Sequence, residues 1–444
     1  MRRFTWGLVA VAVFALGARV VVALVVVPEL SPAFDPELIH QLGTHLADGD
    51  GYIRPPALNG GADTGPTAEF APLTPSLVAA AALVGIDAPH TQGLVLALVG
   101  TLTVVAVGFL GRATAGDAAG LAAAAITAGN PLLVQIDAVL TTESPYLLLV
   151  SCALLLAVRA ARQPTARAFA LLGLVIGTAA LARAEGLLLV LLVAATALAA
   201  RVAARRAAAL ALAGVLGMVV VVAPWTVRNA IRFGELVPVS NNIGSVLAGA
   251  NCPTTYAGER LGSWDFGCVA ELAAESPELR IAPGGPDEAA VYGEWRQRGL
   301  SYAGAHLDEL PRVVAARVAR TWGVFWHPSN QLDRDVAEGR HRGLQTAGFV
   351  VQFVLLVLAA GTCAAWWRAG RPRRWLVSLL VVPCVLALAV PAATVGQTRQ
   401  RTVAEPVLAV AGAVAVVRGV RRVRRLRARV PFGGGVMTGR SAAT

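Results

Sequence analysis

The sequence predicts an all-α polytopic membrane protein, and three observations lead to this prediction. Of the 444 residues, 56% are hydrophobic and only 15% are charged, which is too apolar for a chain of soluble domains. Apolar runs of spanning length recur along the chain, at about 20 residues per span. The basic residues are all arginines, and they cluster at the ends of these runs, where membrane proteins place them.

Ten runs are expected to cross the membrane. They are residues 5–27, 91–111, 117–134, 144–160, 167–183, 186–200, 207–227, 346–367, 375–393 and 405–420. The first run follows Arg2 and Arg3 and lacks an A-x-A-like cleavage site, so we interpret it as a retained helix rather than a signal peptide.

The short apolar segment 72–86, which contains Pro72 and Pro75, decides the orientation of the chain. If it does not cross, every dense arginine cluster faces the cytoplasm, and if it crosses, three loops contradict the positive-inside rule. We therefore expect 72–86 to be a juxtamembrane or re-entrant helix at the outer face. This topology predicts a plasma-membrane protein with both termini in the cytoplasm.

The topology also divides the chain into four parts. Residues 1–227 form a core of seven spans with a first outer loop, 28–90, in which a short interfacial helix is expected over 35–46. Residues 228–345 form a second outer segment, with an amphipathic helix over 287–310 ended by Pro311 and a further helix over 312–326. Residues 346–420 supply three more spans. Residues 421–444 form a basic cytoplasmic tail, expected to be disordered from 431 onward.

Two of the five cysteines, Cys252 and Cys268, lie in the second outer segment, where oxidation is allowed. The other three fall inside apolar runs and are interpreted as packing residues. We predict a disulfide between Cys252 and Cys268, with two free surface thiols as the alternative. Closing this loop contributes about 3 kcal/mol in the chain-entropy description.

Ionisable residues at the outer ends of spans are the candidates for chemistry, because a charge at mid-membrane costs about 2.5 to 3.5 kcal/mol and requires a partner. The expected topology gathers nine of them on one face: Asp35, Asp137, Glu143, Arg183, Glu185, Arg228, Arg399, Arg401 and Glu405. A cavity lined by these carboxylates and guanidinium groups suits an anionic, lipid-linked substrate that meets a neutral hydroxyl nucleophile. Asp35 is the leading candidate for the chemistry.

Five short motifs occur in order along the predicted outer face. They are Asp35 with His40 and Leu46-Ala47-x-Gly49-x-Gly51-Tyr52; Thr67-Ala68-x-x-x-Pro72-Leu73-x-Pro75; Leu140-Thr141-Thr142-Glu143-Ser144; Leu181-Ala182-Arg183-Ala184-Glu185-Gly186; and Ala223-Pro224-Trp225-Thr226-Val227-Arg228-Asn229. Together they resemble the signatures of GT-C glycosyltransferases of family 39, related to protein O-mannosyltransferases and lipid A aminoarabinose transferases.

This resemblance implies a GT-C fold and an inverting transfer from a polyprenyl-phosphate sugar. Asp35 is then the general base that takes a proton from the acceptor hydroxyl, with Glu143 as the second acidic residue. Arginine forks match phosphate oxygens, so Arg228 is the first candidate for the donor phosphate. Arg399 and Arg401 follow it, and His40, Arg183 and Glu185 are candidates for supporting the site.

Each of these assignments has a structural alternative. Asp35 before proline is a common turn and cap pair, and Glu143 would complement the dipole of the helix that it begins. Arg228 follows a tryptophan at a membrane border, where aromatic and basic residues anchor helices. Arg183 and Glu185 would only bridge each other or anchor the chain at the membrane interface.

No metal site is predicted, because His40 and His327 lack a ligand cluster at metal spacing. Whether Asp35 and Glu143 hold a divalent cation stays open. Arg19, within the first span, is expected to reach the interface or to pair with a carboxylate.

The expected partners are a polyprenyl-phosphate sugar, membrane lipids and an acceptor that is a glycan, a lipid or a protein. Nucleic acid is not expected, because the arginines mark span ends. A transporter or flippase of a lipid-linked precursor is the alternative function, although such proteins often show inverted repeats. A scaffold whose outer segment binds a partner is a third interpretation. A cavity at the outer face favours the enzyme, and a path through the bundle favours transport.

Overall fold

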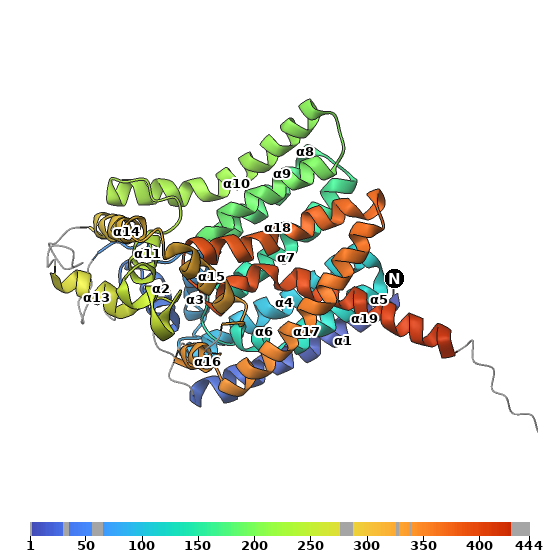
Figure 1. The fold of residues 1–444 in the computed structure, drawn as a ribbon, viewed down its shortest axis with the longest axis horizontal. Helices are drawn as coiled ribbons and strands as arrows, with labels where there is room; N and C mark the ends of the chain where they lie inside the picture. The colour runs from blue at the N-terminus through green and yellow to red at the C-terminus, as the bar shows by residue number, and fades with distance from the viewer. Residues whose placement is uncertain are drawn as a thin grey trace, which may run out of the picture.

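The computed structural model describes residues 2–29, 35–55, 65–275, 287–325, 328–337 and 339–427. Within these ranges the chain is a bundle of helices. The start of α1 (Arg2–Val21) and the far end of α19 (Glu405–Arg427) lie on one side, whereas α11 (Ile243–Ala250), α13 (Phe266–Glu275) and α14 (Glu288–Ala305) lie on the opposite side (Figure 1). The expected disorder from 431 onward and the interpretation of His327 fall outside the described residues.

Seven described helices are long and apolar enough to cross a membrane, so the protein is a multi-pass membrane protein. They are Arg2–Val26, Pro89–Ala115 (α4), Glu143–Arg162 (α7), Ala204–Phe233 (α10), Arg342–Arg368 (α17), Arg373–Ala393 (within α18, Arg371–Ala393) and Thr398–Arg425 (η7, Thr398–Ala404, with most of α19). The three other expected spans are helical but shorter: α5 (Asp117–Gly129), α8 (Ala166–Ala182) and Ala184–Ala199 (η4, Ala184–Leu189, with α9, Val190–Ala199). The count of ten spans is therefore not confirmed.

Local sequence explains why these helices are short. At the end of α5, Asn130 accepts a hydrogen bond from the backbone N–H of Leu132 at 3.1 Å and starts the separate helix α6 (Pro131–Ile136). Asparagine before proline is a common helix start. At the end of α8, Arg183 takes extended backbone angles (φ −148°, ψ 131°). The chain therefore breaks at both places instead of extending one helix.

The first outer loop carries two short helices, as expected: α2 (Asp35–Asp48) and α3 (Leu73–Ala82). They pack closely because Gly43 of α2 has no side chain. A Cβ at this position would lie 2.3 Å from the Val78 side chain of α3. The ten residues of α3 extend about 15 Å, which is half of the hydrocarbon thickness. This length agrees with a helix that does not cross.

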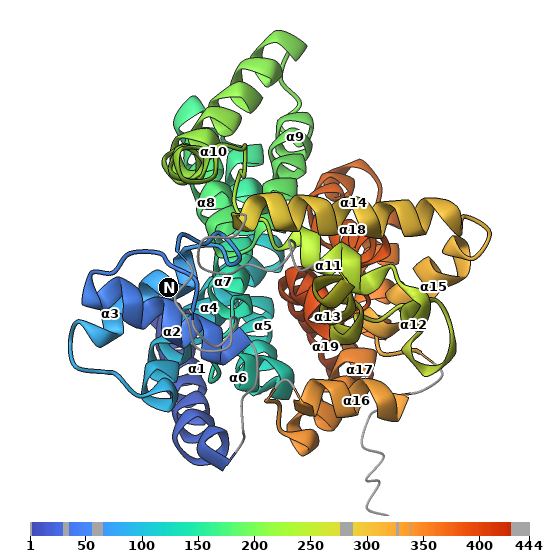
Figure 2. The ribbon, with the colours of Figure 1, turned by 90° about the vertical axis from the view of Figure 1, so that its left-hand side faces the viewer.

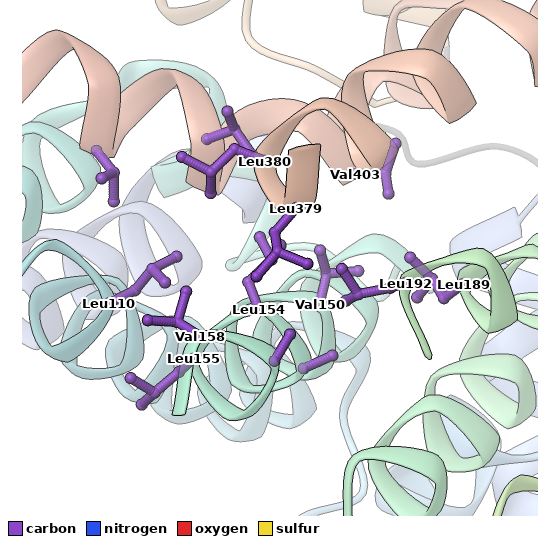
Figure 3. Close-up of a cluster of buried hydrophobic side chains, with 14 of the residues drawn as sticks. Leu110, Val150, Leu154, Leu155, Val158, Leu189, Leu192, Leu379, Leu380 and Val403 are labelled. Carbon is purple, nitrogen blue, oxygen red and sulfur yellow. The ribbon is translucent and has the colours of Figure 1, made fainter. Parts of the chain in front are cut away.

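The largest hydrophobic core joins the spanning helices α4, α7 and α18 with η4, α9 and η7 (Figure 3). Its labelled members are Leu110, Val150, Leu154, Leu155, Val158, Leu189, Leu192, Leu379, Leu380 and Val403. Small residues bring other helices together, since a Cβ on Gly173 of α8 would lie 1.8 Å from the Gly214 carbonyl oxygen of α10. Such small-residue contacts are typical of helix pairs in membranes.

Arg19, in the first span, pairs with Asp137. Its Nε atom lies 2.8 Å from Asp137 Oδ2, and the two side chains are at most 1% exposed. Asp137 follows α6, so the break after α5 brings this carboxylate to α1. Asp137 is thus the carboxylate partner of Arg19, whose charge within a span requires one.

The second outer segment forms a cap of helices. In chain order after α11 these are α12 (Pro253–Tyr256), α13, α14, α15 (Leu310–Thr321) and α16 (Pro328–Ala337). Figure 2 faces this cap, where α14 runs across α11. The expected helix over 287–310 is α14, which begins where Asp287 accepts a hydrogen bond from Ala290 N at 2.8 Å. It ends at Ala305, and Pro311 lies in the first turn of α15 instead of ending α14, a position that suits its missing N–H.

The disulfide between Cys252 and Cys268 is confirmed. It joins the residue before α12 to α13 across a sequence separation of 16, and both cysteines are buried. The bond therefore ties two short helices of the cap that share little core of their own.

Replacing both cysteines by serine should lower the stability of the cap by about 3 kcal/mol, because the unfolded loop regains its conformational entropy. We expect the thermal unfolding midpoint of the purified protein to fall, and reductant to lower the wild-type midpoint to the same value. Cys363→Ser, which removes a free thiol of α17, is the matched control and should respond to reductant as the wild type does. An unchanged midpoint for the double variant would contradict the prediction.

Candidate active site

A cavity of about 1720 Å³ lies between the cap and the ends of the spanning helices. It exceeds the 300 to 1,000 Å³ usual for a small-molecule pocket. The spanning helices contribute only their ends: Glu143 begins α7, and Ala389, Val390 and Ala393 lie at the end of α18. The cap, the first outer loop and the chain breaks supply the rest of the wall.

Five of the predicted site residues line this cavity and form one alternating series of charges, which we call the ion-pair chain. Its members are, in order, Asp35, Arg399, Glu143, Arg183 and Glu185. Arg399 Nη1 donates to Asp35 Oδ2, and Arg399 Nε lies 3.7 Å from Glu143 Oε1. Arg183 Nη1 donates to the same Glu143 oxygen at 2.5 Å, and Arg183 Nε donates to Glu185 at 2.5 Å.

The members of the ion-pair chain differ in exposure. Glu143 is buried, with its side chain 2% exposed, whereas the Asp35 side chain is 31% exposed and that of Arg399 is 23% exposed. Glu143 Oε2 has no hydrogen-bond partner among the described residues. Asp35 and Arg399 are therefore the pair that a ligand in the cavity reaches most directly.

Helix ends and breaks position these side chains. Asp35 and Glu143 are the first residues of α2 and α7, where the helix dipole favours a negative charge. Arg183 lies in the extended break after α8, and Arg399 lies in the 3-10 segment η7 before α19. The sequence motifs around them therefore mark places where spans begin or end.

The segment η7 is fixed by a polar cluster that sequence reasoning missed. Asp335 of α16 accepts from Thr398 Oγ1 at 2.9 Å and from Gln345 Nε2 at 2.5 Å. Arg340, which lines the cavity, donates to Thr398 Oγ1 at 2.9 Å. These contacts hold the residue next to Arg399, and no local motif points to them because they join three separate elements.

A second missed cluster builds the wall beside Asp35. The buried carboxylate of Glu288, in α14, accepts from Arg54 Nη1 at 2.6 Å, Thr67 Oγ1 at 2.6 Å, Ala68 N at 2.7 Å and Asn241 Nδ2 at 2.8 Å. Glu69, which lines the cavity, lies 3.4 Å from Arg54 Nη1. Glu288 thus attaches the first outer loop to the cap.

The Glu69 carboxyl has an unusual proton affinity. Burial raises its pKa to about 7; Arg54 opposes the rise, whereas Glu288 and Asp35 add to it. An unfolded glutamate has a pKa of about 4.3. The folded state therefore binds a proton more tightly than the unfolded state, so stability is lost as the pH rises from about 4.3 through about 7.

Replacing Glu69 by glutamine should remove this loss. Between pH 5.5 and pH 7.5, wild type is expected to lose about 2 kcal/mol relative to Glu69→Gln, so the difference in unfolding midpoint between the two proteins grows with pH. Glu294→Gln is the control, since Glu294 is a half-exposed residue of α14 in an i,i+4 pair with Arg298. Parallel pH curves for wild type and Glu69→Gln would refute the assignment.

Five of the predicted candidates do not line the cavity, namely Asp137, Glu405, Arg228, Arg401 and His40. Asp137 pairs with Arg19, and Glu405 Oε1 lies 3.4 Å from Arg401 Nε. Arg228 donates to the carbonyl oxygens of Thr67 at 2.7 Å and Tyr52 at 2.8 Å, and its guanidinium lies over the ring of Trp225 at 4.8 Å. Arg401 is buried and donates to the Thr321 carbonyl oxygen at 3.0 Å. His40 Nδ1 lies 2.8 Å from Gln92 Oε1. In the structure, Arg228, Arg401 and His40 therefore form polar contacts between different segments of the chain and do not face the cavity.

The cavity residues do not suit a divalent metal ion. No group of three histidine, cysteine, aspartate or glutamate side chains converges within the part of the chain that the structure describes. The carboxylates of Asp35 and Glu143 are separated by the Arg399 guanidinium, whereas hard cations are bound by oxygen ligands.

Comparison with known proteins places the fold. Residues 71–227 match the family described as dolichyl-phosphate-mannose-protein mannosyltransferase. No curated protein matches the sequence.

Among solved structures, the apo oligosaccharyltransferase of Archaeoglobus fulgidus matches with a TM-score of 0.58 and 16% identity, over 96% of this chain and 51% of that chain. AglB from the same organism, in complex with an inhibitory peptide and a dolichol-phosphate, matches with a TM-score of 0.57 and 14% identity, over 99% of this chain and 52% of that one. At these identities the likeness concerns the fold, and this chain spans about half the length of those proteins.

Proposed function

We propose that the protein is a membrane glycosyltransferase, since its chain has the GT-C fold. It takes a sugar from a polyprenyl-phosphate donor and transfers it to an acceptor hydroxyl on the extracytoplasmic side. The observation that carries this proposal is the Asp35–Arg399 pair on the wall of a large cavity at one end of the spanning helices. A base and a phosphate-binding guanidinium lie there within contact of each other.

The reaction uses Asp35 as the general base. Its carboxylate takes the proton of the acceptor hydroxyl while that oxygen forms a bond to the anomeric carbon. The bond from the anomeric carbon to the phosphate oxygen breaks, and the phosphate leaves with the electron pair. Attack from the face opposite the leaving group inverts the anomeric centre. Because phosphate is already a fair leaving group, the protein mainly orients the acceptor and stabilises the departing charge.

The donor phosphate is assigned to Arg399, with Arg340 as the next cation on the same wall. Arg228 and Arg401 are not assigned this role, because their guanidinium groups are directed to backbone carbonyls outside the cavity lining. A phosphate bound to Arg399 replaces the carboxylate of Asp35 as its partner. Donor binding thereby releases Asp35 to accept the acceptor proton, so the base becomes available when the donor is in place.

Glu143, Arg183 and Glu185 act as positioning residues in this proposal. Arg399 is held from one side by Glu143, and Glu143 is held by Arg183. Each charge has an opposite charge beside it, which offsets the cost of removing the group from water. The ion-pair chain therefore keeps the Arg399 fork aimed at the cavity.

The remaining wall offers a place for a lipid chain. Leu187 and Leu188 of η4 and Val390 and Ala393 of α18 line the cavity with apolar side chains. The structural neighbour AglB was solved with a dolichol-phosphate, and the matching family is named for a dolichyl-phosphate-mannose donor. Both support a lipid-linked donor here.

A transporter of a lipid-linked precursor fits the observations less well. Such proteins bind substrate near the bilayer midplane on discontinuous helices. Here the spanning helices reach the cavity only with their ends, and buried leucine and valine side chains occupy the centre of α7. These observations favour chemistry at one face over passage through the bundle.

The deciding experiment incubates membranes that contain the protein with radiolabelled polyprenyl-phosphate sugars. We expect label to move from the lipid to an acceptor with wild type and not with Asp35→Asn. Label that crosses the bilayer while still attached to its lipid would instead support the transporter.

A further inference from the structure

The cap contributes an aromatic surface to the cavity, separate from the ion-pair chain. Trp264 and Phe266 both line the cavity, with ring centroids 6.1 Å apart. Phe266 is 57% exposed, and Trp264 is partly buried. Aromatic faces that line a cavity in this way are available to a ligand.

Trp264 is held in a fixed orientation. Its Nε1 donates to the Ser245 carbonyl oxygen at 3.0 Å. A Cβ on Gly249 would lie 2.3 Å from that same nitrogen, so the glycine lets the indole pack directly on α11. One part of the ring is therefore fixed against α11, and another part lines the cavity.

Polar groups flank the two rings. Asp265, between them in sequence, lines the cavity and accepts from Thr254 Oγ1 at 2.7 Å and Gly267 N at 3.0 Å. Arg260, another lining residue, lies 2.5 Å from Asp265. The disulfide at Cys268 fixes the same stretch. An aromatic surface thus carries a preorganised carboxylate and guanidinium at its edge.

We propose that this surface, formed by Trp264, Phe266, Asp265 and Arg260, is the acceptor subsite and that the acceptor is a saccharide. The inference rests on the proposed transferase function. A sugar ring has an apolar C–H face that packs on an aromatic ring, and its hydroxyl groups bond to charged side chains at the edge. The cavity volume of about 1720 Å³ leaves room for such an acceptor beside a donor sugar.

A peptide acceptor fits this surface less well. Extended peptides are often recognised by adding a strand to an exposed sheet edge. Within the described ranges of the chain, the β pairing consists of one isolated bridge between Ile53 and Pro66. The cap is helical, so it offers a peptide side-chain contacts without a strand to pair with.

The test measures binding by saturation-transfer NMR on the full-length protein in lipid nanodiscs, without donor. The probes are α-1,6-mannotetraose, α-1,5-arabinotetraose and cellotetraose, with a serine-rich and threonine-rich hexapeptide as comparison. We expect at least one tetrasaccharide to receive saturation from wild type. Its affinity should fall about tenfold in Trp264→Ala, because buried tryptophan contacts dominate binding sites.

Two further variants test saccharide binding with smaller changes to the packing of the cap. Phe266→Ala removes a half-exposed ring and should weaken the same saccharide, and Trp264→Phe should retain part of its binding. The matched control is Trp6→Ala, which removes a tryptophan that is 72% exposed in the first span and should bind as wild type does. An equal unfolding midpoint for each variant and wild type shows that the fold is intact.

Binding of the peptide alone, absence of saturation transfer to all three saccharides, or saccharide binding that the Trp264 and Phe266 variants leave unchanged would each overturn the acceptor proposal. The transferase proposal is judged separately by transfer of label from the lipid donor.

Discussion

Asp35→Asn should lower the rate of sugar transfer by about 10² to 10⁴, the contribution of a single positioned general base. Asparagine has nearly the same shape as aspartate but cannot take the acceptor proton. The Asp35 side chain is 31% exposed at the first position of α2, so the change removes a charge without opening a cavity in a core. The measurement is the turnover number at saturating donor, with protein amount and unfolding midpoint matched to wild type.

The matched control for this variant is Asp48→Asn. Asp48 is the last residue of the same helix and is exposed, so it undergoes the same chemical change outside the cavity lining. It should transfer sugar at the wild-type rate. If Asp35→Asn retained more than a tenth of wild-type turnover, Asp35 would not be the base.

Arg399→Gln is expected to reduce kcat/KM for the lipid-linked donor by about 10² to 10³, the usual loss when one donor to a developing oxyanion is removed. The guanidinium contacts the base on one side and lies 3.7 Å from Glu143 on the other. Its removal leaves the leaving phosphate without its cation and the two carboxylates without the charge between them. Arg399→Lys should recover only part of the activity, because an ammonium group lacks the planar fork.

Arg232→Gln provides the comparison for Arg399, since Arg232 is an exposed arginine near the end of α10 that does not line the cavity. Its donor kinetics should match those of wild type. Saturation curves over donor concentration separate the two effects, as weaker phosphate binding raises KM and loss of transition-state stabilisation lowers kcat. Wild-type values for both constants in Arg399→Gln would remove Arg399 from the mechanism.

Hydropathy alone predicted where most helices lie, because a bilayer requires long apolar segments. It failed for the expected span 117–134, because Asn130 ends α5 at Gly129 and starts the separate helix α6. The expected span 167–183 agrees with α8 within one residue at each end. Asp35, Glu143 and Arg399, which lie on the cavity wall, were predicted as candidates for the same physical reason, since each borders an apolar run where a charge is conspicuous.

Other site residues gave no such signal. Glu69 and Arg340 lie in polar stretches, and only the folded chain brings them to the cavity wall. Arg228 is the opposite case, a predicted site residue that does not line the cavity. It borders a span as the true lining residues do, but its guanidinium is directed to the carbonyl groups of the first outer loop. Position at a membrane border therefore identifies candidates without fixing the direction of their side chains.

The hydrogen bonds from Thr398 and Gln345 to Asp335 have a consequence for protein engineering. Asp335 belongs to α16, yet it braces the segment that carries Arg399, so the cap and the membrane-embedded half are not interchangeable modules. A chimaera that grafts the cap of a homologue onto these spans would keep every proposed reacting group and still misplace the cation. Grafts intended to change acceptor preference should therefore stop before residue 328 and leave α16 in place.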